Sequence, residues 1–73
     1  MTWVTLNDTT VRIDHIVSIV MMMEKEEPIF MVQFQNVPAM RVSLYATGGK
    51  WLYMICQHGL EEAKRGGQRY DQL

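Results

Sequence analysis

Hydrophobic residues fill both alternating sets of positions between Ile16 and Met23. The two sets are Ile16, Ser18, Val20, Met22 and Val17, Ile19, Met21, Met23. Apolar side chains on both faces are typical of a strand that is covered on both sides. An eight-residue helix is the alternative, but Ile and Val favour extended structure, and the charged segment EKEEP that follows ends in a proline. We therefore predict a central strand over Ile16–Met23 and a charged loop over residues 24–28.

Four further segments have the pattern of short strands. They are Trp3–Leu6, Thr10–Ile13, Ile29–Gln35 and Met40–Leu44. The turn-forming pair Asn7 and Asp8 separates the first two, and residues 36–39 (NVPA) separate the last two. Connections this short predict antiparallel pairing between consecutive strands.

The periodicity changes to that of a helix after residues 45–49 (YATGG). Apolar residues then recur at helical spacing, at Trp51, Leu52, Ile55, Cys56 and Ala63. Thr47 is suited to cap the start of this helix, and Gly66 and Gly67 are suited to end it. Gly59 lies inside the run and costs about 1 kcal/mol relative to alanine, so we expect the helix to bend or end early there.

Together these elements predict a small α+β fold. Five short antiparallel strands form a curved sheet or a partly open barrel, and one C-terminal helix follows. Residues 1–67 make a single domain, and residues 68–73 (QRYDQL) make a polar C-terminal tail. A chain of 73 residues encloses one small core and buries only about 60% of its unfolded surface.

The fraction of hydrophobic residues is large for a chain with such a small core. Hydrophobic residues make up 48% of the chain and include seven Met. One helix covers one face of a sheet and leaves the other face of the Met-rich strand open. Met side chains are flexible and pack well in adaptable interfaces. We therefore predict a homo-oligomer whose interface contains Val17, Ile19, Met21 and Met23.

Charge, cysteine usage and the length of the apolar stretches indicate which partners and which cellular compartment to expect. Seven Lys or Arg stand against eight Asp or Glu, and this balance disfavours general nucleic-acid binding. The single cysteine, Cys56, has no intrachain partner for a disulfide, which fits a reducing compartment. No apolar stretch reaches the roughly 20 residues that span a bilayer, and no leader pattern is present. We expect a cytoplasmic protein that does not contact membranes.

One short segment has a pattern for ligand binding, and its residues are Thr47, Gly48, Gly49, Lys50 and Trp51. Glycines let backbone N–H groups approach an anion, a helix N-terminus adds positive potential, and Lys50 adds a charge. The complete phosphate-loop pattern is absent, because Trp51 stands where a hydroxyl would hold magnesium. Trp51, Tyr45 and Tyr53 either stack on a flat ligand or supply the core. The segment predicts a strand-to-helix turn or a site for a nucleotide-like anion.

The other reactive residues favour structural roles. His15 and His58 lack the partners that a general base or a metal site needs. Cys56, beside Ile55, is expected to be a small buried hydrophobe. Residues 24–27 (EKEE) form a solvated hairpin tip or present acidic side chains to a basic partner. The sequence therefore predicts no enzyme, no catalytic residue, no metal and no cofactor.

The segment VTLNDTTVRIDHIVSI, residues 4–19, resembles the small flagellar-associated proteins of the FlbD type and many short bacterial and phage proteins. The shared features are Leu-Asn, a turn, a short strand, Asn or Asp, and an Ile-rich strand. The resemblance covers about a quarter of the chain. In the second half QNVPA, residues 35–39, replaces the Asn-Gly hairpin of that template. The resemblance therefore carries no functional residue across.

Two functions follow as expectations. The first is a small, non-enzymatic, oligomeric binding protein with a protein partner, in the style of phage or mobile-element accessory proteins that inhibit a host factor. The second is a module that binds or sequesters a nucleotide-like small molecule at residues 47–51. The first predicts a stable protein complex, and the second predicts a thermal shift with a nucleotide.

Overall fold

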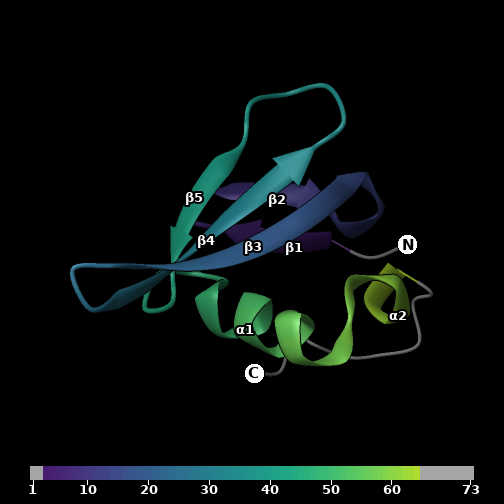
Figure 1. The fold of residues 1–73 in the computed structure, drawn as a ribbon. Helices are drawn as coiled ribbons and strands as arrows, with labels where there is room; N and C mark the ends of the chain where they lie inside the picture. The colour runs from purple at the N-terminus through teal and green to yellow at the C-terminus, as the bar shows by residue number, and fades with distance from the viewer. Residues whose placement is uncertain (1–2, 65–73) are drawn as a thin grey trace.

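A computed structural model describes residues 3–64 of the chain, which form five strands, a 3-10 turn and two helices (Figure 1). The elements in order are β1 (Trp3–Leu6), β2 (Thr9–Arg12), the turn η1 (Ile13–His15), β3 (Ile16–Glu24), β4 (Glu27–Phe34), β5 (Met40–Ser43), α1 (Gly49–His58) and α2 (Leu60–Lys64). Every strand pairing is antiparallel. The predicted α+β class and the five antiparallel strands are confirmed.

The strands form two sheets, so the prediction of one curved sheet or partly open barrel is wrong. One sheet pairs β1 with β2, and the other has the order β3-β4-β5. The turn η1 separates the sheets: Ile13 leaves the predicted strand and begins a 3-10 turn. Inside this turn both carboxylate oxygens of Asp14 accept hydrogen bonds from Arg12, at 3.0 and 3.2 Å. The chain therefore changes direction before β3, and β2 does not pair with β3.

As a consequence β3 is an edge strand, and the prediction of a central strand is also wrong. The middle strand of the larger sheet is β4, which pairs with β3 on one side and β5 on the other. Three of its residues, Ile29, Phe30 and Val32, are buried. The apolar pattern of β3 thus belongs to a strand whose outer edge has no strand partner in the described part of the chain.

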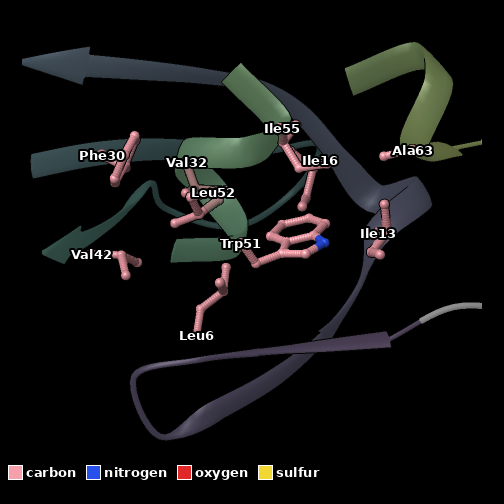
Figure 2. Packing of buried hydrophobic residues seen from close by; sticks show 10 residues of the cluster. All are labelled: Leu6, Ile13, Ile16, Phe30, Val32, Val42, Trp51, Leu52, Ile55 and Ala63. Carbon is pink, nitrogen blue, oxygen red and sulfur yellow. The ribbon is translucent and has the colours of Figure 1, made fainter. Parts of the chain in front are cut away.

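The core lies on one face of the larger sheet, between the sheet, the β1–β2 hairpin and the helices (Figures 1 and 2). Its buried residues are Leu6, Ile13, Ile16, Phe30, Val32, Val42, Trp51, Leu52, Ile55 and Ala63. The ring of Trp51 lies between Leu6 of the hairpin and Ile16 of β3 (Figure 2). One aromatic side chain therefore joins all three layers, which suits the large apolar area of an indole.

The helical region is divided at Gly59, as the glycine in its pattern predicted. Helix α1 ends at His58, and Gly59 adopts a positive φ of 100° that residues with a side chain rarely adopt. The N–H of Gly59 donates to the carbonyl of Ile55 at 2.7 Å before α2 begins. The N-cap is Gly48 and not the predicted Thr47, and it makes no side-chain capping bond. The predicted helix end at Gly66 and Gly67 and the tail over residues 68–73 lie outside the described residues.

The hairpin of β1 and β2 is anchored by its turn residue Asn7. Asn7 has a positive φ of 57°, which asparagine tolerates better than most residues. Its backbone N–H donates to the carbonyl of Thr47 at 3.0 Å, and its Nδ2 donates to the carbonyl of Arg41 at 2.9 Å. These two bonds tie the small sheet to the outer strand β5 and to the turn before α1.

We expect Asn7→Gly to destabilise the protein more than Asp8→Gly does, by about 0.5–1.5 kcal/mol, the usual net contribution of one hydrogen bond. Glycine keeps the backbone N–H and the positive φ of position 7 and removes only the side-chain bond. Asp8→Gly is the matched control, because it adds the same flexibility to the same turn. Urea unfolding of both variants measures the difference. Equal midpoints would show that the Asn7 side chain adds nothing to stability.

Candidate functional site

The β3–β4 hairpin projects beyond the rest of the fold at the left of Figure 1. Its turn contains only Lys25 and Glu26, which have positive φ values of 51° and 66°. Two consecutive residues with positive φ match the tight turns whose twist suits a hairpin. The predicted five-residue charged loop is therefore wrong, because Glu24 and Glu27 are already paired across the two strands. The strands continue to the tip and carry Met21, Met22 and Met23 outward.

The backbone of β3 directs hydrogen-bonding groups away from β4 at every second residue. The carbonyl of Pro28 accepts a bond from the N–H of Leu44 at 3.0 Å, so the polar groups of Pro28 point toward β5. Its partner on β3 is Met23, and this pair is therefore a non-hydrogen-bonded one. The N–H and C=O of Met23 consequently point to the outer edge. The alternation of antiparallel pairs places the same groups of Met21 and Ile19 on that edge.

Apolar side chains flank this edge on both faces of the sheet. Ile19 and Met21 pair with Val32 and Phe30, so they lie on the face of the core. The intervening side chains, among them Met22, lie on the opposite face. The exposed apolar residues of β3 are Val17, Val20, Met21, Met22 and Met23, with exposed fractions between 42% and 62%. The projecting half of β3 is therefore apolar and exposed on both faces.

The structure places three of the four predicted interface residues in one row. Ile19, Met21 and Met23 share a face and an outward-pointing backbone. Val17 does not belong to this regular row, because the pairing register shifts between Ile16 and Ser18 and leaves it at the irregularity. The sequence pattern did not identify Val20 and Met22 as interface residues; they are exposed because no element among residues 3–64 covers the opposite face beside them.

Two of the charged residues near the site have partners within the chain. A guanidinium nitrogen of Arg41 on β5 contacts the Glu24 carboxylate, and the Ser43 hydroxyl donates to the Glu27 carboxylate. The register puts Glu24 and Arg41 on the same face as Ile29, which is only 7% exposed. No charged residue occurs between Ile16 and Met23. The edge is thus an uncharged strip beside a charged hairpin tip.

The predicted ligand segment, residues 47–51, is packed closely against its neighbours. A Cβ on Gly48 would lie 2.4 Å from the carbonyl oxygen of Thr5, and one on Gly49 would lie 2.2 Å from that of Ser43. The N–H of Gly49 donates to the carbonyl of Ala46 at 2.9 Å. These glycines allow backbone segments to approach one another, which is a structural reason for their presence.

The remaining members of that segment point to different environments. Trp51 is only 4% exposed, so stacking of a ligand on its ring is inconsistent with this conformation. Lys50 is exposed, as are Thr47, Tyr45 and Tyr53. The structure does not bring Lys50 and the Trp51 ring to one surface. Binding of a nucleotide-like anion at residues 47–51 stays a prediction.

Cys56 is exposed, so its prediction as a buried residue is wrong. The buried positions of α1 are Gly49, Trp51, Leu52 and Ile55, which form a narrow stripe that Cys56 only borders. Partial desolvation raises the pKa of the Cys56 thiol, which lowers its thiolate fraction at neutral pH. A higher pKa is the opposite of what an activated nucleophile requires.

Other reactive groups are dispersed over the surface. His15 and His58 are both exposed, and Asp14 is bound to Arg12. Residues 3–64 contain no group of three or more His, Cys, Asp or Glu side chains arranged to hold a metal ion. Within the same range no helix combines the length and the apolar character needed to cross a membrane. The most distinctive surface of the described residues is the edge of β3.

Comparison of the chain with protein-family models, characterised proteins and solved structures finds no match.

Proposed function

We propose that this protein is a non-catalytic binding protein that extends its three-stranded sheet along β3 with a strand from a protein partner. The observation that supports this proposal is the outer edge of β3. It combines outward N–H and C=O groups at Ile19, Met21 and Met23 with exposed apolar side chains on both faces. An extended partner uses both features at once, because main-chain bonds hold the added strand and side chains on each face select it.

The edge of β3 lacks the features that keep edges unpaired. Natural proteins protect edges with charged residues, proline, bulges or very short strands. β3 is nine residues long, has no charge between Ile16 and Met23, and has its single irregularity at one end, between Ile16 and Ser18. The two outer strands of this sheet differ in this respect, because β5 has four residues and its Arg41 carbonyl is occupied by Asn7.

The energy available at the site favours a partner strand over a loose hydrophobic contact. Five apolar side chains of β3 are about half exposed. Covering them contributes roughly 4–8 kcal/mol, if full burial of one such side chain contributes about 1.5–3 kcal/mol. Association costs about 4–15 kcal/mol in lost freedom. Apolar contact alone is therefore marginal, and main-chain hydrogen bonds along the edge supply the remainder.

Methionine suits a binding edge of this kind. Its side chain is unbranched and polarisable, so it adapts to the shape of a partner. Three successive Met residues give this adaptability to both faces of one strand. Inhibition of a host factor stays a prediction, because it concerns the identity of the partner.

We expect the double variant Met21→Lys/Met23→Lys to lose association and to keep its fold. Both side chains are exposed in the single chain, so the charges are solvated there, but in a paired edge they would be buried without counterions. The measurement is size-exclusion chromatography with light scattering on protein purified from the cells that express it. Wild type should elute as a complex and the variant as a monomer of 8.5 kDa.

The matched control is Val37→Lys/Tyr45→Lys, which adds the same two charges at exposed apolar residues outside β3. This control should associate like wild type. Circular dichroism of both variants checks that each remains folded. A wild-type protein that is monomeric and free of any bound protein, at micromolar concentration, would contradict the proposed function.

A further inference from the structure

We infer that the strand received by β3 is β3 of a second copy of this chain. The two strands pair antiparallel about a two-fold axis, with Met21 opposite Met21 of the second copy. The sheet then continues through both molecules in the order β5-β4-β3-β3-β4-β5. This inference rests on the proposed function, because it names the partner for the same edge.

The chemistry of the edge sets the requirements for its occupant. The added segment must be extended over about seven residues, uncharged, and apolar on both of its faces. Among the described strands β3 itself has this composition together with an open edge. The strand β4 is similarly apolar but is enclosed between β3 and β5. A second copy therefore presents a segment with the required properties in the required extended form.

The backbone of β3 is self-complementary in an antiparallel arrangement. Outward-pointing groups must oppose outward-pointing groups if hydrogen bonds are to form across the new pair. Centring the pair on Met21 places Ile19 opposite Met23 of the second copy, and Met23 opposite Ile19. All three residues present their N–H and C=O groups to the outer edge. One two-fold axis thus satisfies the whole row, as expected of an isologous interface.

Two neighbouring registers are less favourable. Centring the pair on Val20 places Met23 opposite Val17, which lies at the irregularity of β3 and cannot continue a regular ladder. Centring it on Met22 places Glu24 opposite Val20 and brings the turn residue Lys25 against Ile19. The register centred on Met21 instead places Glu24 opposite Ser18, and it brings Lys25 only against Val17, where the irregularity of β3 ends the regular ladder.

The two-fold axis is perpendicular to the sheet, so each face of one copy continues into the same face of the other. Met21 and Met23 of both copies therefore meet on the face that carries the core. Val20 and Met22 lie next to each other across the axis on the opposite face. The Met side chains on each face of β3 thus contact apolar side chains of the second copy, which accounts for the unusual two-faced pattern.

Disulfide trapping tests the register directly. In a Cys56→Ser background, Met21→Cys places two thiols opposite each other on the axis. The Cα atoms of such a hydrogen-bonded pair are about 5.5 Å apart, which is within the range that a disulfide bridges. After mild oxidation we expect more than about half of this variant to migrate as a dimer on a non-reducing gel, a level consistent with a favourable bridge geometry.

The matched control is Met23→Cys in the same background. Met23 is more exposed than Met21, at 62% against 47%, so random collisions would cross-link it more readily. In the proposed dimer the two copies of residue 23 are four residues out of register, roughly 14 Å apart at about 3.4 Å per residue. We therefore expect at least about a fivefold lower yield of dimer, because this separation exceeds the reach of a disulfide. Replacing both Ile19 and Met23 with cysteine should restore a high yield of cross-linked dimer, because these two residues lie opposite each other in the proposed register.

Two results would overturn the inference. One is equal cross-linking of Met21→Cys and Met23→Cys, which indicates random collision. The other is a Met21→Cys variant that does not cross-link while the wild-type chain sediments as a monomer. The monomer could instead form a complex with another protein, and Met21→Lys/Met23→Lys could abolish that complex. In that case only the self-pairing is wrong and the proposed function stands. If no complex of any kind forms, both are wrong.

Discussion

Replacing Gly49 with alanine should remove at least about 3 kcal/mol from the free energy of unfolding, the upper end of the cost of overpacking. The added Cβ would lie 2.2 Å from the carbonyl oxygen of Ser43 and 2.3 Å from that of Leu44. Both are backbone atoms, so no side-chain rotation relieves the clash. The total stability of a 73-residue chain is about 4–11 kcal/mol at roughly 0.05–0.15 kcal/mol per residue. One methyl group therefore removes a large part of it.

Thermal unfolding followed by circular dichroism measures this effect. For a domain of this size, 3 kcal/mol corresponds to a decrease in Tm of about 12–24 °C. The matched control is Lys50→Ala, because Lys50 is the next residue of α1 and is exposed. Its stability should stay within about 0.5 kcal/mol of wild type, as for most surface changes. An unchanged Tm for Gly49→Ala would mean that the start of α1 does not approach the end of β5 so closely.

Leu52→Ala should destabilise the protein by about 2–5 kcal/mol. Leu52 is fully buried and lies among the core side chains that α1 places against the sheet, near Val32 (Figure 2). Removing Cγ and its two methyl groups loses apolar burial and leaves a cavity that close-packed neighbours fill only in part. The expected decrease in Tm is at least about 8 °C.

The adjacent residue provides the control for this second prediction. Tyr53 lies on the same helix but is 44% exposed. Tyr53→Ala changes helix propensity and side-chain size as well, yet it should cost about 1 kcal/mol or less, close to the centre of the distribution for point mutations. Comparable losses for both variants would indicate that α1 does not dock through the face that contains Leu52.

The exposed Met-rich part of β3 contributes little to the core of the single chain. The core is complete without Met21, Met22 and Met23, since the ten residues of its buried cluster do not include them. Charges on β3 should therefore remove only the concentration-dependent stabilisation that a bound partner adds, whereas Gly49→Ala and Leu52→Ala lower the stability of the single chain itself. This separation between core residues and proposed binding residues makes the proposed function testable in a domain this small.

The sequence by itself determined the local elements and most of the core. Alternation and turn residues located the five strands to within a few residues, because side-chain period and turn chemistry are local properties. Helical spacing identified Trp51, Leu52 and Ile55 as buried, and Gly59 as the interruption. The same spacing failed at Cys56, which borders the buried stripe. The width of that stripe depends on the surface that the helix meets and not on the helix alone.

Only the tertiary structure decided the place of β3 in the sheet. A central strand and an exposed edge strand can have the same apolar pattern on both faces, because this pattern does not specify which strands lie beside it. The turn η1 directs β2 away from β3 and leaves its outer backbone groups open, and that outcome depends on contacts between residues far apart in the chain. Likewise, the pattern of residues 47–51 was compatible with an anion site or a turn. The close approach of Gly48 to Thr5 and of Gly49 to Ser43 gives the glycines a packing role, because distances between separate segments are set only when the whole chain folds.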